Sequence, residues 1–252
     1  FVSDGKAYFG YFVHSPTIPL ARGAPFFALN ITDGSVVWEI DGAFRQSQWG
    51  NRAIIGDSIM VTQDYYDSRL YAVGKGPSEM TVSMSNAVAT AGSPVLVSGT
   101  VMDISPGTQS DILQTRFPKG VPAVSDESMS EWMLYVHKQF TRPMDATGVE
   151  VTVFAQQDEK VIDIGTAVSD ANGRFSITWT PPEGTTGEWD VYAYFSGSAS
   201  YYGSYAKTEM AVFAAPEVPP PAETPPYEWY IIGAAIVVIV VNIVVTLLLR
   251  KK

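Results

Sequence analysis

The sequence predicts an all-β body followed by a single membrane-spanning helix. Tyr, Phe, Trp, Val and Thr are prominent, and Gly and Pro recur throughout the 252 residues. Aromatic and β-branched residues favour pleated strands, and Gly and Pro favour the turns between them. Near the C-terminus an uncharged apolar run interrupts this pattern. The length allows one large domain or two ordinary ones.

The charge balance and the lack of cysteine exclude several classes of function. The chain carries 26 acidic and 16 basic residues, a formal net charge of −10. Binding of nucleic acid usually requires a basic stripe that displaces counterions, and no stretch supplies one, so we expect no nucleic-acid partner. The chain contains no cysteine, which excludes disulfides, thiolate zinc sites and cysteine nucleophiles.

Residues 1–76 contain an imperfect internal repeat. Residues 3–8 resemble residues 56–61, and residues 26–29 resemble residues 70–73. Apolar and polar residues alternate in the runs before and after Asp33-Gly34, and this pattern predicts a β-hairpin with a two-residue turn. A repeat of roughly 40–50 residues built from short strands indicates the blades of a β-propeller.

Residues 27–39, FALNITDGSVVWE, resemble the quinoprotein-type (PQQ-like) β-propeller repeat, whose pattern is approximately LYALDATTGKVVW. The resemblance implies that residues 1–76 form the C-terminal part of a propeller. Two blades cannot close a ring and would leave strand edges open, so we expect further sequence upstream. Residues 1–5 also show no signal peptide, although a protein anchored outside the cell needs a route of export.

Residues 77–214 show the pattern of an immunoglobulin-like (Ig-like) β-sandwich. Short alternating runs are separated by turn-forming residues at 169–173 and 181–184. About seven such strands are typical of a sandwich. The predicted strands span residues 80–85, 94–102, 149–155, 160–168, 174–179, 189–195 and 207–213. Residues 168–176, 180–182 and 194–202 resemble the Ig-like modules that are repeated in archaeal and bacterial surface proteins.

An insertion of about residues 105–147 is predicted to contain a helix. Ser125 is a candidate N-cap, Asp126 and Glu127 suit the first turn, and Pro143 is expected to stop the run. An apolar stripe with helical spacing is expected to cover the sandwich, with a role in filling a partner's groove as the alternative: Met129, Trp132, Met133, Val136 and Phe140.

Residues 117–133 resemble a block found in uncharacterised archaeal surface proteins. Those proteins combine PQQ-like blades, an Ig-like module, a proline-rich stretch and a C-terminal anchor. The resemblance implies the same architecture and an archaeal origin for this chain.

The C-terminal region has the composition of a stalk, an anchor and a tail. Residues 215–228 are rich in proline and predict an extended polyproline II stalk. Residues 229–249 predict a transmembrane helix, with Trp229 and Tyr230 at the interface and an uncharged run from Ile231 to Leu249. A basic tail follows, at Arg250, Lys251 and Lys252. The positive-inside rule places this tail in the cytoplasm and the body outside, as a single-pass protein of the cell membrane.

Few residues predict chemistry. His14 and His137 lack a second ligand at a suitable spacing, and we predict no catalytic, cofactor-binding or metal site. The acidic runs at 64–67 and 158–159 are expected to be solvated loops, with calcium binding as the alternative.

Two further features are candidates for modification or binding. Asn30 begins a glycosylation sequon, although its place in a predicted hairpin disfavours modification. Tyr201, Tyr202 and Tyr205 are expected to pack on their own sandwich, with stacking against sugars as the alternative.

The sequence thus predicts a non-enzymatic, membrane-anchored binding or scaffolding protein of the cell envelope. Its expected partners are membrane lipid, envelope proteins or glycans, and no cofactor is expected. The alternative is the C-terminal part of a membrane-tethered quinoprotein dehydrogenase, whose catalytic propeller would lie upstream.

Overall fold

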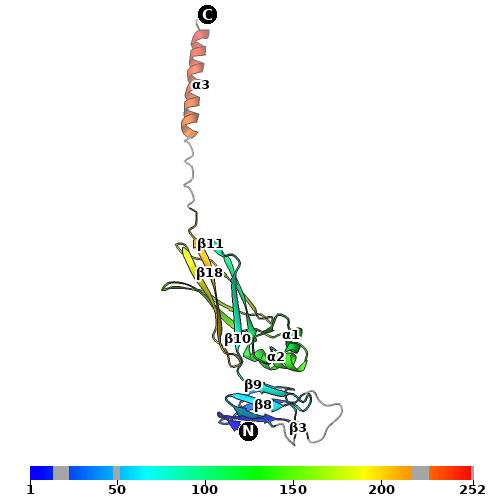
Figure 1. Ribbon diagram of the computed structural model, residues 1–252. Helices are drawn as coiled ribbons and strands as arrows, with labels where there is room; N and C mark the ends of the chain where they lie inside the picture. Colours follow the sequence, from blue (N-terminus) through cyan, green and yellow to red (C-terminus); the bar gives the residue numbers. More distant parts are fainter. Residues whose placement is uncertain (14–22, 48–51, 217–226, 251–252) are drawn as a thin grey trace. The chain divides into compact units, whose positions relative to one another are not determined.

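The computed structural model describes residues 1–13, 23–47, 52–216 and 227–250 (Figure 1). The chain divides into two compact units, residues 1–215 and residues 216–252. Strands account for 42% of the structure, and a single apolar helix lies at the C-terminal end of the described chain. The prediction of a mostly-β chain with one C-terminal helix that could span a membrane is therefore confirmed.

The described part of residues 1–76 contains two small antiparallel sheets and one short strand pair. The first sheet has the order β1-β2-β4-β5, the second the order β7-β8-β9, and β3 pairs with β6 in parallel. The strands are β1 (Val2–Ser3), β2 (Lys6–Gly10), β3 (Phe12–Val13), β4 (Phe26–Asn30), β5 (Val36–Ile40), β6 (Gln46–Ser47), β7 (Ile54–Gly56), β8 (Ile59–Gln63) and β9 (Leu70–Val73).

The internal repeat is visible in the strand pairing. The last residue pair before the turn is Ser3 with Lys6 in the hairpin of β1 and β2, and Gly56 with Ile59 in the hairpin of β7 and β8. Both residues of each turn have positive φ, with values of 48° and 66° at residues 4–5 and 48° and 61° at residues 57–58. Such turns match the twist of the flanking strands. In each copy the next repeated segment, β4 or β9, pairs with the second strand of the turn.

The hairpin at Asp33-Gly34 differs from its prediction. Residues 31–35 connect β4 to β5, and the Asn30 N–H donates to the Ser35 carbonyl at 2.8 Å. The predicted two-residue turn is therefore wrong. Local side-chain bonds favour the longer loop, because Asn30 Oδ1 accepts from the Thr32 N–H and Asp33 Oδ1 accepts from the Ser35 N–H.

Two larger sheets follow, and their buried faces share one core. One sheet contains β10, β12, β13 and β16, and the other has the order β11-β18-β17-β14-β15. The strands are β10 (Ser78–Met84), β11 (Val88–Thr90), β12 (Val95–Asp103), β13 (Val121–Pro122), β14 (Glu150–Gln157), β15 (Lys160–Val168), β16 (Arg174–Trp179), β17 (Gly187–Phe195) and β18 (Ser204–Phe213).

The core of these sheets follows the predicted alternation. Val95, Val97 and Val101 are buried on β12, and Phe175 and Trp179 are buried on β16. The facing β17 buries every second residue from Trp189 to Phe195. The period-two pattern thus identified the interior faces correctly.

Two helices lie in the chain between β12 and β14: α1 (Asp111–Arg116) and α2 (Asp126–Lys138). Ser125 occupies the predicted N-cap position of α2, but its side chain makes no cap hydrogen bond. Its hydroxyl lies 3.0 Å from that of Thr147 instead. The helix ends at Lys138, and its C-cap Gln139 has a left-handed conformation with φ of 58°, so the helix stops before the predicted breaker Pro143.

The helix α2 packs on two sides. Trp132 and Val136 are buried with Leu113 of α1 and with Val121 and Val124. A second side carries the buried Leu134, which was not part of the predicted stripe, into the small core of residues 1–76. Phe140 was predicted to cover the sandwich as part of the stripe, but it follows the helix and packs in this small core instead. The Ser130 hydroxyl donates to the Glu39 carbonyl of β5. Covering the two large sheets is therefore only part of what this helix does.

The second unit contains the helix α3 (Tyr227–Leu249). Its mean hydropathy is 3.0 in the most apolar window, and none of that window is buried inside the structure. The helix begins earlier than the predicted Trp229 and ends at the predicted Leu249. Most of the predicted stalk, residues 217–226, and the tail residues Lys251 and Lys252 lie outside the described residues.

Candidate functional site

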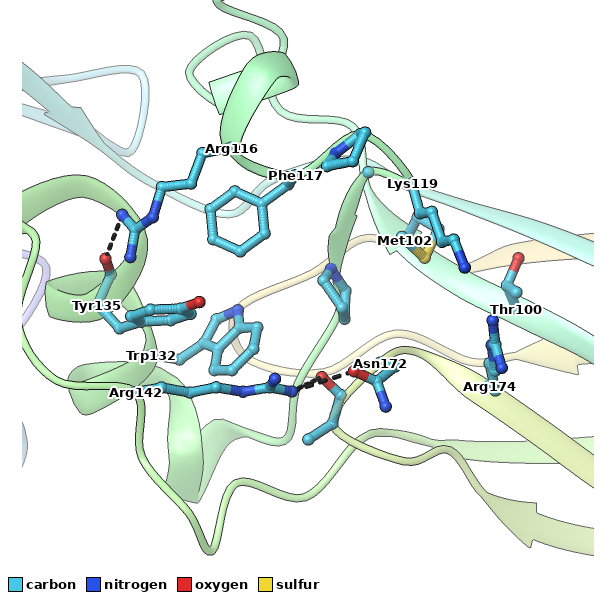
Figure 2. A pocket seen from close by; sticks show the side chains of 14 residues that line it. Thr100, Met102, Arg116, Phe117, Lys119, Trp132, Tyr135, Arg142, Asn172 and Arg174 are labelled. Atoms are coloured by element: carbon cyan, nitrogen blue, oxygen red, sulfur yellow. Dashed lines mark hydrogen bonds between the residues drawn. The ribbon is translucent and has the colours of Figure 1, made fainter. Parts of the chain in front are cut away.

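A basic pocket lies beside α2, and its volume is about 530 Å³ (Figure 2). Its walls come from β12 and β13, from the end of α1 and the segment after it, from α2 and the segment after it, and from the turn before β16 with the first residue of that strand. Figure 2 shows Arg116, Tyr135 and Trp132 on one side and Lys119, Thr100 and Arg174 on the other. We define the basic pocket by four cationic and three aromatic lining residues: Arg116, Lys119, Arg142, Arg174, Phe117, Trp132 and Tyr135.

The charge of the pocket lining is opposite in sign to the net charge of the chain. The protein has a net charge of −10, yet no aspartate or glutamate lines the pocket. Among the described residues, none of its four cationic side chains forms an ion pair with a carboxylate. Asp170, which is not part of the lining, interacts electrostatically with Arg174 and offsets part of this charge. Cations that are concentrated and only partly offset create a local positive potential that attracts anions.

Arg116 is held in place by the end of α2. Its Nη1 donates to the carbonyls of Tyr135 and Val136 at 2.8 and 3.0 Å. Carbonyls in the last turn of a helix lack helical partners, and they carry the negative end of the helix dipole. The guanidinium also lies 4.3 Å from the ring centre of Tyr135 and 5.0 Å from that of Phe117. These contacts fix the guanidinium and leave its other N–H groups available.

Arg142 is fixed in a similar way by the turn before β16. Its Nη2 donates to the Ala171 carbonyl and to Asn172 Oδ1, both at 3.1 Å. Its guanidinium lies 5.7 Å from the ring centre of Trp132. The indole N–H of Trp132 is buried without an acceptor, but the indoles of Trp179 and Trp189 share this property, so it does not single out the pocket.

The turn that holds Arg142 is itself ordered by Asp170. Its carboxylate accepts from the backbone N–H groups of Asn172 at 2.8 Å and Arg174 at 2.9 Å. Burial opposes ionisation of Asp170, but these hydrogen bonds and the charge of Arg174 outweigh it and lower the pKa of the carboxyl. Gly173 has φ of 75°, and an added Cβ would lie 2.6 Å from the Val101 carbonyl, so the turn also requires glycine.

Lys119 and Arg174 complete the positive rim. Both residues are exposed, and their side chains make no hydrogen bond within the described chain. Arg174 lies opposite Thr100 in the pairing of β12 with β16, and this register fixes the position of its Cα beside the pocket. Among the described residues, the pocket lining contains no histidine, carboxylate or cysteine, and its cations are suited to binding an anion.

The pocket was not predicted from the sequence. Its basic residues come from three separate parts of the chain and meet only through strand register and the packing of α2. One local signal was present, because the stretch between Asp111 and Asp126 contains Arg116 and Lys119 and no acidic residue.

The predicted glycosylation site Asn30 lies at the end of β4 and is partly buried. Its Oδ1 accepts a hydrogen bond from the Thr32 N–H at 2.9 Å. The side chain is thus engaged in the turn that joins β4 to β5. Glycosylation of Asn30 stays a prediction.

The acidic run at 64–67 is not the solvated loop that we predicted. Asp64 is fully buried and forms an ion pair with Lys138 of α2, whose side chain is 4% exposed. Asp67 lies 3.4 Å from the same amine and accepts from the Tyr71 hydroxyl at 2.6 Å. Within the described part of the chain, no group of three or more potential ligand side chains could hold a metal ion.

The remaining candidates fall in different environments. His137 is largely buried, and burial lowers its pKa. His14 lies outside the described residues. Tyr201 is buried and donates to Asp103 Oδ2 at 3.2 Å, as expected for packing, whereas Tyr202 and Tyr205 are exposed.

The comparisons with known proteins do not identify a family. No family model matches the chain, and no curated protein matches it. The sporulation control protein Spo0M from Bacillus subtilis is 12% identical over 56% of this chain and 51% of that chain, with a TM-score of 0.31. The bacterial hydrophobin BslA is 11% identical over 56% of this chain and 98% of that chain, with a TM-score of 0.25.

Latent PorU from Porphyromonas gingivalis is 13% identical over 60% of this chain and 14% of that chain, with a TM-score of 0.28. The chain therefore spans about half the length of Spo0M and a small part of PorU. TM-scores this low carry no argument about fold or function.

Proposed function

We propose that this chain is a non-enzymatic, single-pass membrane protein that presents a binding or scaffolding body at the surface of the cell envelope. The observation that carries the proposal is α3. Its 23 residues extend about 35 Å at 1.5 Å per residue, enough to cross a hydrocarbon core of ~30 Å. Trp229 and Tyr230 flank the apolar run on one side, and Arg250 follows it on the other. These flanks favour an external body and a cytoplasmic C-terminus.

The proposal assigns the two β parts of the body to PQQ-like propeller blades and an Ig-like module. The four-stranded antiparallel sheet β1-β2-β4-β5 has the strand number of a propeller blade, which supports the first assignment. Two facing sheets around one core support the second. The resemblance of residues 117–133 to a block of archaeal surface proteins supports the further proposal that this chain is an archaeal surface protein.

Detergent partition of the full chain tests the anchor. We expect the protein to enter the detergent phase, and we expect a variant with Val237→Asp and Val241→Asp to shift to the aqueous phase. Each charge near the centre of a span disfavours insertion by about 2.5–3.5 kcal/mol. A matched variant with Val237→Leu and Val241→Leu controls for mutation at these positions. Recovery of the unaltered chain in the aqueous phase would refute membrane anchoring.

Cysteine labelling tests the orientation, because the natural chain contains no cysteine. We expect Thr178→Cys, at an exposed position of β16, to react with an impermeant maleimide on intact cells. Lys252→Cys should react only after the membrane is permeabilised. The opposite pattern would reverse the proposed topology.

A further inference from the structure

We propose that the basic pocket beside α2 binds an acidic saccharide, meaning a sugar chain that carries carboxylate or sulfate groups. This inference deepens the proposed function by naming a class of ligand. It depends on that function only for placing the ligand outside the cell. The pocket itself is defined by the contacts of residues 100–174.

The first argument is charge. Four cationic side chains line one pocket of a strongly acidic protein, and no carboxylate among the described residues pairs with them. Random placement of charges on an acidic surface does not favour such a group of cations. A ligand with several negative charges would supply the missing counter-charges.

The second argument is preorganisation. Arg116 is held by two helix carbonyls and two aromatic rings, and Arg142 is held by the turn at Ala171 and Asn172. Each guanidinium therefore has a fixed position before the ligand arrives, and it retains unused N–H donors. A planar guanidinium matches the geometry of carboxylate and sulfate oxygens. Because these side chains are already ordered, binding loses less conformational entropy.

The third argument is the size and chemistry of the space between the cations. A pocket volume of about 530 Å³ is much larger than an inorganic oxyanion. Met102 and Pro122 contribute apolar surface to the lining, and Thr100 and Asn172 contribute uncharged polar groups. A sugar ring, which has an apolar face and hydroxyl edges, suits this mixture.

A peptide ligand fits the same space less well. Its backbone N–H groups need acceptors, but each of the pocket carbonyls of Tyr135 and Ala171 already uses one of its two lone pairs on an arginine. Sugar hydroxyls both donate and accept, so they adapt to a lining that is rich in donors. The observations therefore favour a saccharide over an acidic peptide.

Calorimetric titration of the full chain in detergent micelles tests the inference. The probes are trigalacturonate, a heparin-derived tetrasaccharide, the methyl ester of trigalacturonate and a triglutamate peptide. We expect at least one of the two acidic saccharides to bind, with a Kd that rises as salt is added. Absence of binding by both acidic saccharides would overturn the proposal. Equal binding of the neutral ester, or equal or tighter binding of triglutamate, would also overturn it.

Two variants with equal loss of charge locate the site. Lys119→Gln combined with Arg174→Gln removes two pocket cations whose side chains make no hydrogen bond within the described chain. Asp170 loses the nearby charge of Arg174 but keeps its hydrogen bonds from the backbone N–H groups of residues 172 and 174, so folding should be preserved. We expect the Kd to rise at least about tenfold. The control, Arg69→Gln combined with Lys160→Gln, removes two exposed cations that do not line the pocket, and it should leave the Kd within about twofold.

An equal effect of both variants would show that binding follows net charge, and it would overturn the assignment to the pocket. Detergent partition of each variant is measured in parallel. Failure of the anchor would then be seen in partition, whereas failure of the site would be seen in the titration, so the two proposals are tested separately.

Discussion

Residues 77–214 and residues 1–76 differ in the size of their apolar cores and in the partners of their buried carboxylates. The core shared by the two large sheets is made almost entirely of valine, alanine and aromatic residues. The first segment has a small apolar core around Phe26, Phe44 and Met60. Next to it lie buried polar residues: Arg45, Gln46, Thr62 and Asp64.

The small core of the first segment is completed by α2, which belongs to the connection between β12 and β14. Leu134 is buried in that core, and Lys138 neutralises the buried Asp64. The large sheets bury their apolar faces against each other, and their buried carboxylate, Asp103 of β12, accepts a hydrogen bond from the Tyr201 hydroxyl. We therefore expect changes on this side of α2 to destabilise residues 1–76 selectively, while the large core remains folded.

The largest effect is expected for Lys138→Met. The variant leaves Asp64 buried with hydrogen bonds from the N–H groups of Arg45 and Tyr66 but without its cation. Removal of one partner of a buried ion pair typically destabilises by about 3–5 kcal/mol. Denaturant unfolding of the full chain measures the change, and hydrogen exchange shows where it acts. Loss of protection should be concentrated in β4, β5, β8 and β9.

A loss of less than about 1 kcal/mol in that experiment would show that water reaches Asp64 readily, contrary to its burial. Equal loss of exchange protection in β14 and β17 would show that the two cores unfold as one unit. Either outcome would break the proposed contrast between the two segments.

The next effect is expected for Leu134→Ala. Truncating a buried leucine removes apolar contacts and leaves a cavity, at a cost of about 2–5 kcal/mol. The matched control is Val136→Ala, because Val136 is buried on the other side of α2 with Leu113 and Trp132. Exchange should rise in residues 26–73 for the first variant and around α1 and β13 for the second. The same pattern in both would show that α2 does not separate two clusters.

Acidic pH is expected to weaken the contact between residues 1–76 and α2, because Asp67 lies close to the Lys138 amine. Burial opposes ionisation of Asp67, but hydrogen bonds from Tyr71 and the Arg69 N–H and the charge of Lys138 outweigh it, so its pKa lies below the ordinary 3.8. The unfolded chain therefore takes up this proton first as the pH falls. The stabilisation is complete well above pH 3.8 and is lost as the pH falls through the lower pKa of the folded state.

The variant Asp67→Asn should flatten the dependence of stability on pH below about 5 and cost on the order of 1 kcal/mol at neutral pH. Asp57→Asn is the control, because Asp57 is exposed in a turn with φ of 48°, which asparagine also tolerates. Identical dependences of stability on pH for the unaltered protein and Asp67→Asn would show that protonation of Asp67 does not cause the loss of stability at acidic pH.

The contrast between the segments also marks what the sequence could predict. Long alternating runs in residues 77–214 identified strands closely, and β15 (Lys160–Val168) and β16 (Arg174–Trp179) have the predicted bounds. The very short β11 (Val88–Thr90) and β13 (Val121–Pro122) were not predicted, because a run of two or three residues is too short to display an alternating pattern. The ion pair of Asp64 with Lys138 was also missed, since its members are distant in sequence and each has the pattern of a solvated residue.

The candidate site illustrates the same limit. The apolar stripe on α2 predicted that Trp132 and Val136 would be buried, and they are. It gave no indication that Arg142 would reach Ala171 or that Arg116 would cap the end of α2. Those contacts depend on how α2 is oriented against β12 and β16, which local patterns do not specify.

The smallest effect is expected for the exposed ion pairs of Lys207. Its amine lies 3.1 Å from Asp190 and 3.3 Å from Glu209, on the outer face of the sheet that contains β17 and β18. Hydrogen bonds to Asp190 and then to Glu209 raise the pKa of the lysine, but solvent screens all three groups. Thermal unfolding of Lys207→Met should therefore match that of the unaltered protein. Lys138→Met removes the same atoms from a buried pair, so a similar loss of stability in both variants would mean that burial of the charge does not distinguish the two segments.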